Sequence, residues 1–161
     1  MKILFIQTGG TIDKDYPKTK AYAFEIGEPA VKRILNKINP NFSYKILPLV
    51  RKDSLDLNNL DRDRILKVCR QAREEKIIIT HGTDTMVKTA KVLSVIKNKT
   101  VVITGSLRPE KFADSDAAFN LGLAVAAVQV LHIGVYIAMS GRIFVWNKVR
   151  KDLKTGKFVV S

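Results

Sequence analysis

The sequence predicts a three-layer α/β sandwich with a mainly parallel sheet. Short apolar runs, suited to strands, alternate along the chain with longer segments whose apolar residues recur at helical spacing. One of the runs, 77–79, is isoleucine at every position, as expected for a strand that is covered on both faces. Helix-length connections between successive strands favour parallel pairing, because a parallel strand needs a crossover to return.

Five segments have the length and composition of buried strands. β-Branched residues are frequent in them, and turn-forming residues separate them from the segments that follow. The expected strands are 2–7, 44–47, 76–80, 100–104 and 133–139. After Gly141 the pattern changes, and apolar runs at 143–146 and 158–160 predict a terminal hairpin or edge.

Four longer segments carry apolar residues three and four positions apart. The expected helices are 28–38, 60–75, 84–96 and 115–130. Pro29 suits the first turn of the first helix, where a missing N–H costs nothing. The buried stripes expected in the first three helices are Val31, Ile34, Leu35 and Ile38; Ile65, Val68, Cys69 and Ala72; and Met86, Ala90, Leu93 and Ile96.

Length and composition indicate one globular domain covering residues 1–161. An apolar fraction of 46% and a charged fraction of 27% are typical of a soluble protein. Cys69 is the only cysteine, so no intramolecular disulfide can form and a reducing compartment is favoured. The start of the chain lacks the pattern of a signal peptide, and no apolar run is long enough to span a membrane. We therefore expect a cytoplasmic location.

The formal net charge of +13 raises the question of an acidic partner. Basic residues occur through most of the chain, and 142–157 concentrates six of them against one acid, Asp152. The preferred interpretation is a solvated basic exterior, because no nucleic-acid-binding module or interleaved aromatic residue accompanies the charge. A surface for nucleic acid or an acidic partner is the alternative.

Two motifs rich in glycine and threonine follow expected strands. Thr-Gly-Gly-Thr-Ile at 8–12 comes after the first strand, and His-Gly-Thr-Asp-Thr at 81–85 comes after the strand at 76–80. The carboxyl ends of parallel strands meet at one edge of a sheet, so a single pocket for a small polar substrate is expected there. A threonine hydroxyl needs a base or relay to act as a nucleophile, and a lysine reaching Asp84 would complete one.

These motifs make the chain resemble the bacterial-type L-asparaginase family. The similarity rests on the two motifs above, on Asp-Ser-Leu-Asp at 53–56, on 101–109 and on 115–121. It extends over essentially the whole chain and implies hydrolysis of asparagine, and of glutamine in many members, to the acid and ammonia through an acyl-threonine intermediate. The family fold matches the predicted sandwich, and neither a cofactor nor a metal is implied.

The resemblance also assigns roles to individual residues. Thr11 would be the nucleophile, and Tyr22, in the loop after the first motif, would align it and close over the substrate. Thr83, Asp84 and a lysine would form a second catalytic group, with Lys151 preferred over Lys148. The substrate-binding residues implied are Gly10, Ser54, Gly82, Thr83 and Asp84.

Two departures from the family leave other functions open. Leu55 replaces a residue that is polar in many members. Typical members are also far longer, with a C-terminal domain that contributes to the dimer and to the neighbouring active site. We expect this chain to lack that domain, as a natural single-domain form, a fragment or a truncated gene product. One alternative is a catalytically weak module that binds amino acids. Another is an ammonia-supplying, asparaginase-like subunit of a tRNA-dependent amidotransferase. A homodimer or other homo-oligomer is expected.

Other conspicuous residues receive structural interpretations. His81 is expected to be a satisfied turn residue rather than a general base, and His132 to pack or lie at the surface. The spacing of His, Cys and carboxylate residues matches no metal site. Gly9 and Gly10 lack the lysine of a phosphate loop. Phe144 and Trp146 are assigned to packing of the tail or to an oligomer contact.

Overall fold

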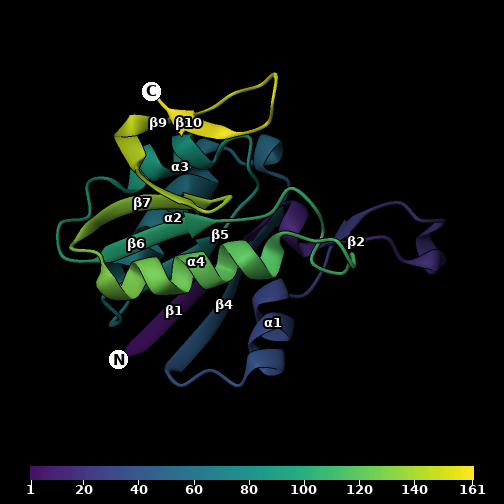
Figure 1. Cartoon of the computed structure of the whole chain (residues 1–161), viewed down its shortest axis with the longest axis horizontal. Coiled ribbons are helices and arrows are strands. Elements are labelled where there is room, and N and C mark those ends of the chain that lie inside the picture. The colour runs from purple at the N-terminus through teal and green to yellow at the C-terminus, as the bar shows by residue number, and fades with distance from the viewer.

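The computed structural model describes residues 1–161, in which a six-stranded sheet lies between two layers of helices (Figure 1). The strand order is β4-β1-β5-β6-β7-β8, and only the edge strand β8 runs antiparallel to its neighbour. The strands are β1 (Lys2–Gly9), β4 (Ser43–Lys52), β5 (Lys76–Thr80), β6 (Thr100–Thr104), β7 (Gly134–Met139) and β8 (Arg142–Val145). The predicted fold class is confirmed.

Two helices cover each face of the sheet. Helices α1 (Ala30–Ile38) and α4 (Ala117–Val130) lie on the face turned to the viewer in Figure 1, and α2 (Asn59–Gln71) and α3 (Met86–Leu93) lie on the other. The side chains of β5 alternate between the two cores: Ile77 and Ile79 pack with α2 and α3, whereas Ile78 packs with α1 and α4. The uninterrupted isoleucine run is thus the consequence of a strand buried on both faces.

All four helices are shorter than the sequence indicates: α1 and α4 each begin two residues later than expected, and α2 and α3 also end earlier. Helix α2 begins with a capping box, in which Asn58 and Asp61 exchange side-chain-to-backbone hydrogen bonds of 3.0 Å. It ends at Gln71 instead of 75, because the backbone of Ala72 is extended and Lys99 Nζ donates to the carbonyl oxygens of Ala72 and Glu74. Helix α3 ends at Leu93 rather than 96 and starts at Met86, two residues after the expected start.

The end of the chain forms both an edge strand and a hairpin, as predicted. Strand β8 pairs with β7, and β9 (Val149–Lys151) pairs antiparallel with β10 (Phe158–Val160). Buried Phe144, Val149 and Phe158 join the core on the α3 side, and Trp146 packs against it. The expected packing role of Phe144 and Trp146 is thereby confirmed.

The remaining elements are short. They are η1 (Thr11–Asp13), β2 (Lys14–Asp15), η2 (Lys18–Lys20), β3 (Glu25–Ile26), η3 (Ser54–Asp56) and η4 (Trp146–Lys148). The segment between β2 and β3 projects from the body of the molecule, at the right in Figure 1. No helix combines the length and apolar character needed to cross a membrane.

Candidate active site

Three loops at the carboxyl ends of β1, β4 and β5 meet backbone to backbone. A Cβ placed on Gly10 would lie 2.3 Å from the backbone nitrogen of Gly82, and one placed on Gly82 would lie 2.6 Å from Cβ of Ser54. The N–H of Gly10 also donates to the carbonyl oxygen of Lys52 at 2.9 Å. Glycine is required at these positions because a side chain would force the loops apart. The three motif segments therefore form one site.

The backbone of Gly10 sets the direction of the chain into Thr11. Its φ of 85° and ψ of −175° lie in a region that is essentially restricted to glycine. Immediately afterwards the chain enters η1, of which Thr11 is the first residue. The strained turn thus ends β1 and places Thr11 at the edge of the sheet beside the second motif.

The threonines of the two motifs differ in what their hydroxyl groups contact. Thr8 is buried and donates to the carbonyl oxygen of Thr80 at 2.8 Å, and Thr85 donates to the carbonyl oxygen of Ser54 at 2.7 Å. Thr11 is half-buried, and no group of the chain engages its hydroxyl. Thr8 and Thr85 hold the loops together, whereas the hydroxyl of Thr11 is available to a substrate.

Lys151 reaches the second motif from the C-terminal hairpin. Its Nζ lies 2.7 Å from Oγ1 of Thr83 and 2.6 Å from Oδ1 of Asp84. The Lys151 side chain is 15% exposed and that of Asp84 is 42% exposed, so the cation is more enclosed than its counter-ion. Because Lys151 donates to the oxygen of Thr83, the hydroxyl hydrogen of Thr83 remains free to be donated elsewhere.

Ser54 packs against Gly82 of the second motif, and its hydroxyl group makes no hydrogen bond. The residue is 1% exposed, and its Oγ has no hydrogen-bond partner. The neighbouring Asp53 pairs with Lys14 at 2.7 Å. Burial opposes ionisation of Asp53, but the hydrogen bond and the charge of Lys14 outweigh it and keep the pKa of Asp53 below its usual value. Leu55, the departure noted in the sequence, is 71% exposed.

Tyr22 does not join the other predicted residues. It lies on the projecting segment between β2 and β3, where it is 62% exposed and has a φ of 62°. Its hydroxyl makes no hydrogen bond, and Figure 1 shows the segment directed away from the sheet. A role for Tyr22 over Thr11 would require this segment to fold back, and stays a prediction.

His81 supports the second motif and is not free for acid–base chemistry. Its Nδ1 lies 2.7 Å from the carbonyl oxygen of Gly82 and its Nε2 lies 2.8 Å from Oγ1 of Thr89. The side chain is fully buried, and this burial lowers the pKa of His81 to about 4. The interpretation of His81 as a satisfied turn residue is confirmed. His132, at the other end of the sheet, is exposed.

Sequence reasoning missed Arg62, which organises the second motif from α2. The residue is 3% exposed, and its guanidinium donates to the carbonyl oxygen of Leu57, to Thr89 Oγ1 and to Thr85 Oγ1. Burial lowers its pKa from the usual value. A signal was present, since residue 62 falls on the helical stripe of Ile65 and Cys69 and a buried arginine needs partners.

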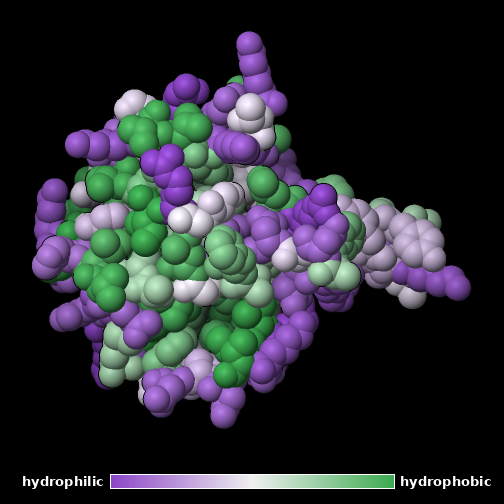
Figure 2. Space-filling view, viewed as in Figure 1, coloured by the Kyte–Doolittle hydropathy of each residue, from purple (hydrophilic) through white to green (hydrophobic).

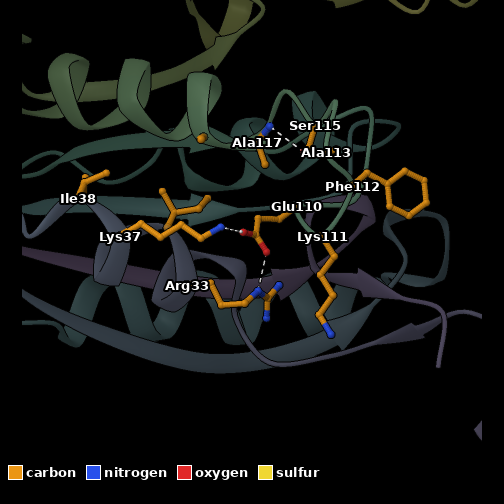
Figure 3. A pocket seen from close by; sticks show the side chains of 11 residues that line it. Arg33, Lys37, Ile38, Glu110, Lys111, Phe112, Ala113, Ser115 and Ala117 are labelled. Atoms are coloured by element: carbon orange, nitrogen blue, oxygen red, sulfur yellow. Dashed lines mark hydrogen bonds and ion pairs between the residues drawn. The ribbon is translucent and has the colours of Figure 1, made fainter. Parts of the chain in front are cut away.

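A cavity of about 590 Å³ lies away from the threonine motifs, between α1 and the segment that precedes α4. Figure 3 shows Glu110 in this cavity between Arg33 and Lys37, and none of the predicted site residues lines it. No group of three or more His, Cys, Asp or Glu side chains is arranged to hold a metal ion.

Comparison with known proteins identifies the family. The model of the asparaginase N-terminal domain matches residues 2–157. The chain belongs to the asparaginase family. The L-asparaginase of Thermococcus kodakarensis is 30% identical over 94% of this chain and 48% of its own length. The solved structure of the thermostable L-asparaginase from Thermococcus kodakarensis superposes with a TM-score of 0.85 at 26% identity, covering 99% of this chain and 51% of that one.

One further relative is more similar over a shorter stretch. A glutamyl-tRNA(Gln) amidotransferase subunit of Methanococcus vannielii is 44% identical over 71 residues, which are 43% of this chain and 17% of the amidotransferase subunit. This asparaginase-family chain spans about half the length of the L-asparaginase that it matches. The family match covers residues 2–157 of this chain.

Proposed function

We propose that this chain is the catalytic domain of an asparaginase-type amidohydrolase that releases ammonia from L-asparagine, and from L-glutamine as a second substrate. The observation that carries the proposal is the placement of Lys151 Nζ against Thr83 and Asp84, whose loop touches the one bearing the free hydroxyl of Thr11. A nucleophile and a hydrogen-bonded proton relay on adjoining loops are what acyl transfer from an amide requires.

Thr11 attacks the side-chain amide carbon of the substrate in the first half-reaction. The bond from Thr11 Oγ1 to the acyl carbon forms, the carbon–nitrogen bond breaks, and the hydroxyl proton leaves with the nitrogen as ammonia. Water then hydrolyses the acyl-threonine, restoring the hydroxyl of Thr11 and releasing the acid. In this proposal Thr83, which is held by Lys151 on the loop that contacts Gly10, passes the protons, and Asp84 stabilises the lysine in its charged form.

The rest of the substrate would lie against the loop contacts described above. We assign the α-carboxylate to Ser54, whose hydroxyl has no partner in the chain, and the α-ammonium to Asp84, whose carboxylate is partly exposed. Gly10 and Gly82 permit close approach to the backbone. Tyr22 would contact Thr11 once the segment between β2 and β3 closes over the bound substrate.

Ammonia release from L-asparagine is the direct test. Thr11→Ala and Thr83→Ala are expected to abolish release, whereas Thr155→Ala, on the turn of the C-terminal hairpin, is the matched control and should retain it. Circular dichroism checks that all three variants fold. An active Thr11→Ala protein would refute the assignment, and binding of asparagine without turnover by the unmodified chain would favour an amino-acid-binding module instead.

We propose further that residues 1–161 form one domain, that the protein is cytoplasmic, and that it self-associates. Self-association is supported by α4, which carries no charged residue and exposes Phe119 and Val130 to 64% and 76%. Figure 2 shows apolar side chains across this face. Sedimentation velocity at micromolar concentration should give a species of twice the chain mass, and a monomer would contradict this part.

A second candidate is the ammonia-supplying subunit of a tRNA-dependent amidotransferase. It is favoured by the 44% identity to the Methanococcus amidotransferase subunit over 71 residues and by the net charge of +13, which suits a nucleic-acid complex. In that case ammonia release would depend on a partner subunit and tRNA. Full activity of the isolated chain, with no salt-dependent retention on immobilised tRNA, would exclude this candidate.

A further inference from the structure

Lys14 connects the segment of Thr11 with the loop that follows β4. It comes directly after η1, and its N–H donates to the carbonyl oxygen of Thr11. Its Nζ lies 2.7 Å from Oδ2 of Asp53, the residue before Ser54. The side chains of Lys14 and Asp53 are 15% and 22% exposed, so solvent and salt screen this ion pair less than a pair at the open surface.

Asp53 determines where Ser54 lies. It is the N-cap residue of η3, in which its carbonyl oxygen accepts from the N–H of Asp56 at 3.0 Å. Ser54, the next residue, is 1% exposed and packs against Gly82 of the second motif. A shift of Asp53 would therefore move the hydroxyl group that we assign to the α-carboxylate of the substrate.

Lys14 is also the first residue of the β2–β3 hairpin, residues 14–26. It pairs with Ile26 of β3, and its Nζ lies over the ring of Phe24, 4.3 Å from the ring centre. The negative face of an aromatic ring attracts a cation in this position. Phe24 lies two residues after Tyr22, on the segment that projects from the body of the molecule (Figure 1). The same ammonium group thus contacts both the hairpin and the loop of Ser54.

A second ion pair holds the hairpin away from the site. Successive side chains of a strand point to opposite faces, and Asp15, the residue after Lys14, pairs with Lys111 in the segment that precedes α4. This pair fixes β2 without involving Asp53 or Ser54. The two ion pairs of β2 therefore allow the holding of the hairpin to be separated from its link to the loop of Ser54.

We propose that Lys14 is a positioning residue that couples the β2–β3 hairpin to the loop of Ser54 through its ion pair with Asp53. A ligand that fixes Ser54 also holds Asp53 in place, which strengthens the pair with Lys14 and keeps the base of the hairpin docked. The coupling is reciprocal, so a docked hairpin favours binding of the ligand. The effect on the amino-acid ligand rests on the proposed function, whereas the link between Asp53 and the hairpin does not.

Trypsin cleavage after Lys18 and Lys20, followed by mass spectrometry, reports on opening of the hairpin. Lys14→Met keeps an unbranched side chain and removes the cation, whereas Asp53→Asn keeps the N-cap acceptor and removes the anion. We expect each variant to be cleaved about fivefold faster than the wild type. Lys14→Arg should be cleaved at the wild-type rate, because it retains the cation.

Cleavage after Lys154, in the turn of the C-terminal hairpin, is the internal reference for a general loss of structure. Adding Asp53→Asn to Lys14→Met should accelerate cleavage of the β2–β3 hairpin no further, because the pair is already broken. Adding Lys111→Met, which breaks the separate pair with Asp15, should accelerate it further. A wild-type cleavage rate in Asp53→Asn, or fully additive effects of Lys14→Met and Asp53→Asn, would overturn the proposal.

L-Aspartate, the product of the proposed reaction, tests the coupling to the substrate site. At concentrations that saturate each protein, it should slow cleavage of the hairpin about fivefold in the wild type, in Lys14→Arg and in Lys111→Met. Lys14→Met and Asp53→Asn should lose most of this protection. Protection of Lys14→Met equal to that of the wild type would show that the ligand holds the hairpin by another route and would overturn the proposal.

Kinetics separates positioning of the substrate loop from general damage. KM for asparagine should rise about fivefold in Lys14→Met and in Asp53→Asn, with a smaller fall in kcat, and Lys14→Arg should restore it. A KM that is unchanged in both charge-removing variants would also overturn the proposal. A chain that neither binds aspartate nor releases ammonia refutes the proposed function instead, and cleavage of Asp53→Asn without ligand then still decides whether Lys14 links the two loops.

Discussion

Gly10→Ala should separate the two threonine loops, and its cost can be worked from the structure. The backbone at Gly10 costs a residue with a side chain about 1–3 kcal/mol in strain. The new methyl would also overlap the backbone of Gly82, whose nitrogen lies 2.3 Å from the Cβ position, and forced overpacking adds about 1–3 kcal/mol. Together these terms lower the free energy of unfolding by about 2–6 kcal/mol.

Gly122→Ala is the matched control. Gly122 lies inside α4, and a Cβ there would have no atom within 4 Å. The same substitution should therefore stabilise the protein by about 0.5–1 kcal/mol, because glycine is the poorer helix former.

Urea denaturation and thermal melting measure both variants. For a domain of this size, 1 kcal/mol corresponds to roughly 2–4 °C in Tm, so the two melting temperatures should move in opposite directions. If Gly10→Ala matched the wild type in Tm and in ammonia release, the backbone contact between the motifs would not be what assembles the site.

Three other buried groups and the Ser54 hydroxyl give separate predictions. His81 stays neutral in the folded protein down to its pKa of about 4, whereas in the unfolded chain it takes up a proton near pH 6.5. The free energy of unfolding should therefore fall by on the order of 3 kcal/mol as pH is lowered between these values. Asp13 acts oppositely: its pKa of about 7 in the folded protein is above that of the unfolded chain, so its contribution lowers the free energy of unfolding as pH rises from about 4 to about 7. Asp13→Asn removes this contribution, so the free energy of unfolding measured by urea titration should fall more steeply as pH is lowered through this range. An unchanged slope would contradict this prediction. Burial raises the pKa of Cys69 to about 12, which leaves roughly one thiol in ten thousand ionised at pH 8, so a thiol reagent should label it only after unfolding. Ser54→Ala removes a hydroxyl without a partner and should change the unfolding free energy by less than about 1 kcal/mol while raising KM for asparagine; an unchanged KM would remove Ser54 from the substrate site.

Periodicity predicted the helices and the strands β1, β5, β6 and β7, most of whose residues are buried, whereas the edge strand β4, also expected to be buried, is only partly so. It failed at the end of α2, where Lys99 captures carbonyl oxygens from a distant part of the chain. The spacing of apolar residues within one segment cannot predict a contact with a residue so far away in the chain. The end of α3 was placed too late for a similar reason, since apolar Ile96 is buried although it lies beyond the helix.

The sequence predicted the motifs of the candidate site, but not the buried charged residues that hold these motifs in place. The glycines and threonines carry the family resemblance, and that resemblance also selected Lys151, which spacing alone could not distinguish from other lysines. Asp13 looks like an ordinary surface charge in the sequence, and the position of Arg62 on the stripe of Ile65 and Cys69 indicates burial but not the groups that it binds. The burial of Asp13 depends on elements packed from both sides, so only the assembled structure reveals it.

The contact of Lys151 with Thr83 joins residues 68 positions apart in the chain. The C-terminal hairpin that delivers the lysine is fastened to the core mainly by Val149 and Phe158. Long-range contacts of this kind form late, because their loop-closure entropy must be overcome before they stabilise anything. Ammonia release should accordingly recover more slowly during refolding than the circular dichroism of the sheet. The rate at which activity returns would then measure the docking of the C-terminal hairpin as the last step of folding.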